Sequence, residues 1–223
     1  YQPDEGEIRI DGAVMPAMKP RDAIAHGVQV IYQDFSLFPN LTVAENLSLN
    51  KFLSERRALA DRSEMRRLGA EALARLGVEI DLEAEVGSLS TADRQRVAIA
   101  RALMSDVRLL IMDEPTTALT GREVDRLFQL VRDIQSRGIA ILFVSHKMSE
   151  MLSISERIVV FRNGRKVAEG PTAEFDEPRI TREMTGQDIG VQRYAWTGDR
   201  ALSPRLETRS LSVGSLVENV SLS

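Results

Sequence analysis

Two short apolar runs, at residues 109–112 and 139–144, constrain the fold of this chain most strongly. Each run is wholly apolar, which is typical of a strand buried on both faces of a parallel sheet. Between them, apolar residues three and four positions apart from Val124 to Ile134 predict an amphipathic helix that ends at Gly138. Strand, helix and strand in this order imply a right-handed crossover and a parallel pair. The sequence therefore predicts an α/β fold with a parallel core sheet.

Polar residues follow both runs. Asp113 and Glu114 come directly after the first run, and Ser145 and His146 come directly after the second. The carboxyl ends of parallel strands share one edge, where open α/β sheets bind ligands. There Asp113 can hold Mg²⁺ and Glu114 can polarise an attacking water, while His146 can hydrogen-bond a γ-phosphate or that water. Taken singly, a charged loop and an ordinary strand-end histidine explain the same residues.

Gln33 and Ser90 are two further candidates. Gln33 follows a strand expected at residues 28–32, and its amide oxygen can orient water and contact Mg²⁺. Alone, it is better explained as an exposed polar residue at a strand end. Ser90 and Asp93 fit a capping box at the start of a helix that includes residues 94–103. The capping box is a sufficient structural explanation, but a helix N-terminus also offers free N–H groups that can bind phosphate.

The rest of the chain alternates between helix signals and hairpin signals. Residues 7–12 predict an exposed strand that enters a tight turn, and Asn163-Gly164 predicts a type I′ hairpin between residues 157–162 and 166–169. We expect a short helix at residues 21–26, and a longer one from Asp61, capped with Glu64, to Gly77. Residues 190–204 have no periodicity and are expected to form a linker, and residues 206–223 resume strand-like patterns.

Composition excludes several classes of function. With 29 Lys and Arg against 33 Asp and Glu, the net charge is 29 − 33 = −4, so the chain has no global attraction to nucleic acid or anionic lipid. The absence of cysteine excludes disulfides, thiolate zinc sites and cysteine nucleophiles. The longest apolar run has six residues, whereas a transmembrane helix needs about 20.

The order of these motifs resembles that of the ATP-binding cassette (ABC) family. The likeness extends from Tyr1 to about Ile189 and rests on five motifs in sequence. Gln33 resembles the Q-loop glutamine, residues 89–95 the signature motif, residues 109–114 the Walker B motif, residues 117–120 the D-loop, and His146 the switch histidine.

The resemblance implies a P-loop NTPase-like nucleotide-binding domain with a parallel core sheet, a helical subdomain and an antiparallel β piece. It implies ATP and Mg²⁺ as cofactors and ATP hydrolysis as the activity. The residues it assigns are Glu114 and His146 for catalysis, Asp113 and Gln33 for the metal, and Gln33, Ser90, Thr91, Ala92 and Asp113 for the nucleotide.

Two details resemble the ATPase subunits of monosaccharide importers of the ribose and galactoside type. Leu119-Thr120 stands where many relatives carry Leu-Asp, and Ala92 stands where most carry glycine. Those subunits join two cassettes in one polypeptide, so we expect a first cassette at 1–189, a linker at 190–205 and the first strands of a second cassette at 206–223. The implied partners are membrane permease subunits docked by the loop 34–41, a second ABC domain and, indirectly, a sugar-binding protein, with no nucleic acid. The implied location is the cytoplasmic face of the cell membrane.

The pattern departs from the family in two places. A P-loop needs two glycines five positions apart with Lys after the second, and no pair among the 14 glycines meets this spacing. The family places that loop shortly before the segment that starts at Tyr1, so we expect an N-terminally truncated domain that alone binds Mg-ATP poorly. Asp93 stands where the family carries glutamine, and a carboxylate near a γ-phosphate is repulsive unless capping holds it.

Two alternatives to a transport ATPase stay open. A soluble ABC ATPase acting in DNA repair or on ribosomes is disfavoured, because Gln33 and Ser90 are only 90 − 33 = 57 residues apart with no cysteine between them. The segment 190–204 is also short and weakly charged for a ribosome-type linker. A non-catalytic, truncated interaction module is the second alternative.

Overall fold

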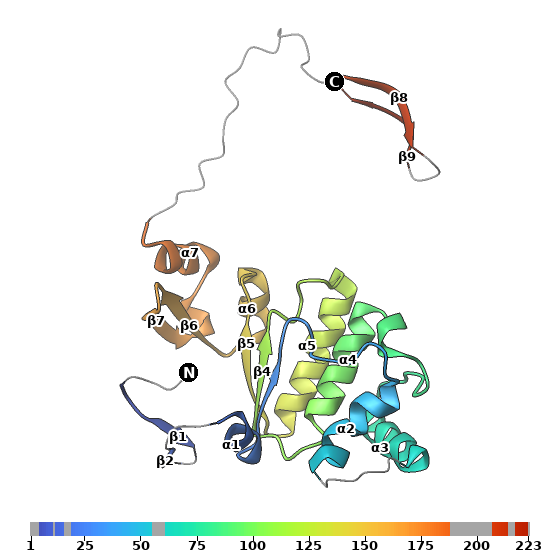
Figure 1. Ribbon diagram of the computed structural model, residues 1–223. Coiled ribbons are helices and arrows are strands. Elements are labelled where there is room, and N and C mark those ends of the chain that lie inside the picture. The colour runs from blue at the N-terminus through green and yellow to red at the C-terminus, as the bar shows by residue number, and fades with distance from the viewer. Residues whose placement is uncertain are drawn as a thin grey trace. The chain divides into compact units, whose positions relative to one another are not determined.

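The computed structural model describes residues 5–10, 12–15, 19–54, 61–187, 207–213 and 217–222 (Figure 1). The chain divides into two units, Tyr1–Thr185 and Gly186–Ser223. The segment expected to be a linker, residues 190–204, lies outside the described residues. Among the described residues, no helix is both long and apolar enough to cross a membrane.

A three-stranded parallel sheet lies at the centre of the described part of the first unit. Its order is β3 (Val28–Ile31), β4 (Leu109–Asp113) and β5 (Ala140–Val144). Helix α5 (Gly121–Ser136) connects β4 to β5, which pair parallel, so the predicted parallel pair and the predicted α/β class are confirmed.

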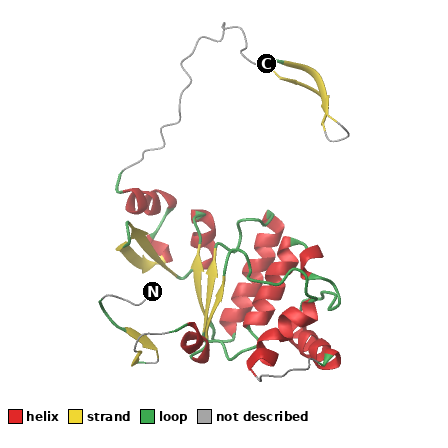
Figure 2. Ribbon diagram, viewed as in Figure 1, coloured by secondary structure: helices red, strands yellow, loops and turns green. Residues whose placement is uncertain are grey.

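One face of this sheet packs against helices. Figure 1 shows α5 and α4 (Thr91–Ala102) on one side of the strands, and Figure 2 shows them in red beside the yellow sheet. Alternate strand residues point to this side because side chains in a strand alternate between faces. The core comprises Ile31, Leu110 and Met112 from the strands, Ala98, Ile99 and Ala102 from α4, Leu127, Phe128, Val131 and Ile134 from α5, and Val107 and Ile154.

The other face of the sheet is more exposed than the sequence predicts. Leu142 and Val144 of β5 are 50% and 44% exposed, and Val30 of β3 is 36% exposed. The prediction that residues 139–144 form a strand buried on both faces is therefore wrong for this strand. The physical reason is that α4 and α5 cover the face that carries Ile141 and Phe143, and the intervening side chains point away from them.

A small helical layer packs beside α4 and contains α2 (Val43–Ser54), α3 (Arg62–Arg75) and the 3-10 turn η1 (Val86–Ser88). Helix α3 was predicted, although Asp61 caps it through the backbone N–H of Ser63 at 2.9 Å rather than through Glu64. Helix α2 was not predicted, although Thr42 and Glu45 form a capping box at its start. The layer has its own core of Val43, Leu47, Ala72, Leu73, Val86, Val97 and Ala100.

The chain before β3 forms two local elements that match the sequence pattern. Strands β1 (Ile8–Ile10) and β2 (Ala13–Met15) pair antiparallel, as expected for the hairpin. Helix α1 (Pro20–Ala25) ends before Gly27, whose φ of +79° is a conformation that glycine adopts readily.

An antiparallel piece follows β5 and α6 (Met148–Ile154). Strands β6 (Arg157–Arg162) and β7 (Arg165–Pro171) pair around Asn163-Gly164, where both residues have positive φ as a type I′ turn requires. The 3-10 turn η2 (Thr172–Glu174) and α7 (Glu177–Thr185) complete this piece. In the second unit, β8 (Thr208–Val213) pairs antiparallel with β9 (Val217–Leu222).

Candidate functional site

The carboxyl edge of the parallel sheet carries the candidate residues from β4 and β5. Asp113 of β4 pairs in register with Val144 of β5, so the residues that follow these strands lie side by side. The backbone N–H of Glu114 donates to the carbonyl oxygen of Val144 at 2.8 Å. The sheet register therefore extends to Glu114 and sets it next to the turn that carries His146.

Glu114 and His146 are in direct contact. Nδ1 of His146 lies 3.0 Å from Oε1 of Glu114. The hydrogen bond from His146 holds the pKa of the Glu114 carboxyl below its usual range, burial opposes this, and a weaker bond from Thr117 adds to it. Glu114 is therefore an ionised acceptor at neutral pH.

The backbone at Glu114 is in an unusual conformation. Its φ is +45°, which non-glycine residues rarely adopt. The following residue, Pro115, is held by α4, because Nε2 of the buried Gln95 donates to the carbonyl oxygen of Pro115 at 2.8 Å. Such conformations persist where the surrounding structure fixes them, and they are common at functional sites.

Gln33 and Asp113 line one cavity of about 610 Å³ together with Tyr32, Asp34 and Ser36. The carboxylate of Asp113 and the amide oxygen of Gln33 are oxygen ligands of the type that Mg²⁺ prefers. No cluster of three or more His, Cys, Asp or Glu side chains suited to a metal occurs in the described residues. This donor set fits Mg²⁺, which commonly takes one or two protein ligands and completes its shell with substrate phosphates and water.

Ser90 and Asp93 form a cap at the start of α4. The backbone N–H of Asp93 donates to Oγ of Ser90 at 3.1 Å, and that hydroxyl donates to Oδ2 of Asp93 at 2.8 Å. Arg96 donates to Oδ1 of Asp93 at 2.9 Å, so both carboxylate oxygens have partners within the first turn. Thr91 and Ala92 are the first helical residues, where backbone N–H groups lack partners inside the helix. These side-chain bonds of Ser90 and Asp93 thus stay within the first turn of α4.

Arg101 holds the loop that follows Gln33, a role that the sequence does not reveal. Its guanidinium donates to the carbonyl oxygens of Ser36 at 2.8 Å and Phe35 at 3.1 Å. Phe35 and Ser36 have φ of +61° and +47°, so the arginine stabilises a turn of unusual backbone conformation. Burial lowers the pKa of Arg101. No local sequence signal marks this contact, because its partners are 65 and 66 residues away.

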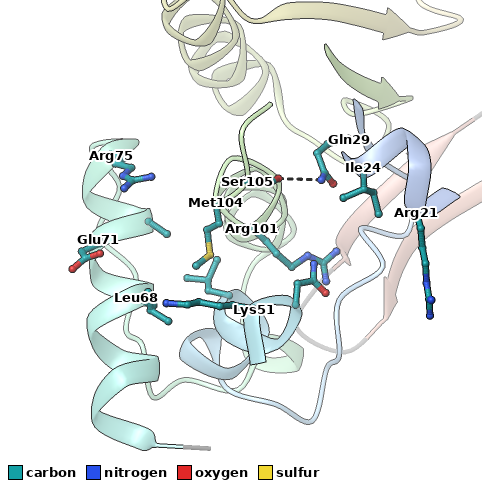
Figure 3. Close-up of a pocket in the computed structure, with 13 residues that line it drawn as sticks. Arg21, Ile24, Gln29, Lys51, Leu68, Glu71, Arg75, Arg101, Met104 and Ser105 are labelled. Carbon is teal, nitrogen blue, oxygen red and sulfur yellow. Dashed lines mark hydrogen bonds between the residues drawn. The ribbon is translucent and has the colours of Figure 1, made fainter. Parts of the chain in front are cut away.

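A groove of about 910 Å³ lies next to Arg101, between α1, α2, α3 and the end of α4 (Figure 3). In Figure 3, α3 with Glu71 and Arg75 forms one wall and α1 with Arg21 and Ile24 faces it. Leu47, Leu68, Ala72 and Met104 make part of the lining apolar, and its cationic side chains are those of Arg21, Lys51, Arg75 and Arg101. Glu71 is the one acidic side chain among the described residues that line the groove, so the lining is net positive.

Comparison with known proteins identifies the family. The ABC transporter model matches residues 1–117. The putative ribose/galactose/methyl galactoside import ATP-binding protein 2 of Agrobacterium fabrum is 42% identical over 189 residues, which are 85% of this chain and 37% of that protein. The ribose import ATP-binding protein of Corynebacterium glutamicum is 39% identical over 222 residues, which are 100% of this chain and 42% of that protein. The chain thus spans about two fifths of the length of these relatives.

Solved structures agree with this assignment. A dimeric ATP-binding cassette in a post-hydrolysis state, bound to ADP and phosphate, is 26% identical with a TM-score of 0.63, covering 77% of this chain and 75% of its own. A nucleotide-free cassette from an ABC transporter shares the fold at 20% identity and a TM-score of 0.68, covering 82% and 78%. Since the family model matches more than half of the sequence, this chain belongs to the ABC transporter family.

Proposed function

We propose that the complete protein containing this chain is the ATP-binding and ATP-hydrolysing subunit that powers import of a sugar through a membrane ABC transporter. The observation that carries the proposal is the 3.0 Å contact between Glu114 and His146, next to the cavity lined by Gln33 and Asp113. Relatives named as ribose or galactose import ATP-binding proteins support the sugar substrate class.

Glu114 and His146 are proposed as the catalytic pair. Because its pKa is lowered, Glu114 is a carboxylate at neutral pH and would polarise the attacking water. His146 would position that water and the γ-phosphate, and the shared hydrogen bond would keep both side chains oriented.

Five further residues are proposed to hold the cofactors. Asp113 and Gln33 would hold Mg²⁺, which neutralises phosphate charge when bound. The first N–H groups of α4, at Ser90, Thr91 and Ala92, would bind the phosphates of ATP held mainly by an opposing cassette.

Permease subunits are the proposed membrane partners, and they would place the protein peripherally at the cytoplasmic face of the membrane. We propose that a permease segment docks at the loop 34–41 and in the adjoining groove. The net positive lining with an apolar part suits an amphipathic segment that carries carboxylates. A sugar-binding protein would act through the permease, without contacting this chain.

The proposed domain arrangement places one cassette at residues 1–189, a linker at 190–205 and the opening strands of a second cassette at 206–223. The 223 residues contain no P-loop motif, whose backbone N–H groups and lysine grip the phosphates. We therefore expect the isolated chain to hydrolyse ATP at background rate, so a test of ATPase activity requires the complete protein.

The test is ATP hydrolysis and sugar uptake by the complete protein reconstituted with its permease in vesicles. Coupled hydrolysis and uptake support the proposal. Hydrolysis with co-purification on ribosomes, and none with a permease, would replace it by the soluble alternative. Arg75→Glu on the groove wall should reduce recovery with the permease, whereas Arg122→Glu, on the exposed surface of α5, should not.

A further inference from the structure

Glu150 of α6 is a buried carboxylate that the proposed function does not use. The residue is 9% exposed, and its partner Thr116 is 1% exposed. Oε2 of Glu150 accepts a hydrogen bond from the hydroxyl of Thr116, and Oε1 lies 3.1 Å from Nζ of Lys147. A buried carboxylate is costly unless it is paired and hydrogen-bonded, and Glu150 meets both conditions.

The partners of Glu150 belong to two different turns. Thr116 is in the turn that begins at Glu114, and Lys147 follows His146 directly. Nζ of Lys147 also donates to the carbonyl oxygen of Thr116 at 3.1 Å, so Lys147 contacts both Glu150 and Thr116. Side chains therefore connect the two turns that carry the proposed catalytic pair.

The network adds to other contacts that hold the turn at Glu114. Glu114 keeps a φ of +45°, and its N–H bonds to Val144. Pro115 is held by Gln95 from α4, and Thr116 is held through both its hydroxyl and its carbonyl oxygen by Glu150 and Lys147. Of these contacts, those of Glu150 and Lys147 are the ones that link Thr116 to the turn of His146 through side chains.

We propose that Glu150 is a positioning residue for ATP hydrolysis, which fixes the turn of Glu114 against the turn of His146 through Thr116 and Lys147. This inference rests on the proposed ATPase function. Glu150 itself does not touch the reacting atoms. Its loss lets the two turns move relative to each other, so the contact between Glu114 and His146 is populated less.

The experiment compares Glu150→Gln with Glu156→Gln in the complete protein. Gln keeps the size of Glu150 but removes the charge that pairs with Lys147, and Glu156 is an exposed carboxylate just after α6. We expect Glu150→Gln to lower kcat by about 10- to 100-fold, the range for a small displacement of catalytic groups, with the KM for ATP unchanged. In a Glu114→Gln background the same change should have no further effect, because both act on one step.

Hydrogen exchange gives a readout that does not need turnover. In Glu150→Gln the amide of Glu114 should lose at least about ten-fold in protection, while amides of β4 such as those of Leu110 and Met112 keep theirs. If the wild-type protein hydrolyses no ATP, the proposed function fails, and exchange at Glu114 alone decides the positioning role. Unchanged kcat, unchanged protection at Glu114, or a parallel loss across β4 overturns the inference.

Discussion

Oε1 of Glu114 lies 3.0 Å from Nδ1 of His146, although the two residues are 32 positions apart in the sequence. The contact follows from the parallel register of β4 and β5, which pairs Asp113 with Val144 and so aligns the residues that come next. The position of the pair therefore depends on the parallel register of the sheet. Substitution of either residue tests the chemistry proposed for the pair.

Glu114→Gln tests the proposed role of the carboxylate. Gln has the same size but cannot carry the negative charge, so kcat for ATP should fall by about 10²- to 10⁴-fold, the usual worth of a general base. ATP binding should be retained, because other groups of the complete protein bind the phosphates. The measurement is steady-state hydrolysis beside equilibrium nucleotide binding in the complete protein, with Glu156→Gln as control. Retained hydrolysis would remove Glu114 from this role.

The edge of the sheet could be predicted because its residues follow short apolar runs directly. Asp113, Glu114 and His146 needed no more than the strand ends and the parallel direction that the connecting helix implies. Local capping also identified the start of α4 at Ser90, and the same signal at Thr42 would have identified α2.

The supporting contacts could not be predicted because they join residues far apart in sequence. Arg101 bonds to Ser36, Gln95 to Pro115 and Glu150 to Thr116, and each pairing exists only once the chain has folded. Exposure of Leu142 and Val144 was missed for a related reason. An apolar run does not state which of its two faces is covered.

Arg101→Met tests whether the arginine holds the loop after Gln33. The substitution keeps an apolar stem but removes both donors, and the loss of a typical hydrogen bond costs about 0.5–1.5 kcal/mol. Amides in residues 35–38 should therefore exchange at least about ten-fold faster in hydrogen-exchange mass spectrometry. Arg122→Met on the exposed surface of α5 is the matched control. Equal exchange in Arg101→Met and wild type would show that other contacts suffice.

Asp93→Gln tests the departure from the family signature. The carboxylate of Asp93 is held by the hydroxyl of Ser90 and by Arg96, so it acts as part of the helix cap. Restoring glutamine should leave ATP hydrolysis and transport unchanged, whereas Ser90→Ala should destabilise α4 by about 1 kcal/mol as a lost cap. The measurements are hydrolysis, uptake and urea unfolding. A rise in hydrolysis with Asp93→Gln would mean that the carboxylate repels the nucleotide held by the opposing cassette.

The capping box of α5 should make stability depend on pH. Glu123 accepts hydrogen bonds from the backbone N–H and the hydroxyl of Thr120, each at 2.8 Å, and the backbone bond is the main reason that its pKa is lowered. Because the folded pKa lies below the unfolded one, the stabilisation is fully present above the unfolded value of about 4.3 and is lost as pH falls through the folded value.

Urea unfolding of the complete protein, followed by circular dichroism from pH 7 to pH 3, should therefore show Glu123→Gln less stable than wild type near neutrality. The difference should shrink below about pH 4 as the wild-type carboxylate becomes protonated. Glu156→Gln should show no such convergence, and a Glu123→Gln deficit that stays constant down to pH 3 would rule out the ionised carboxylate as its source.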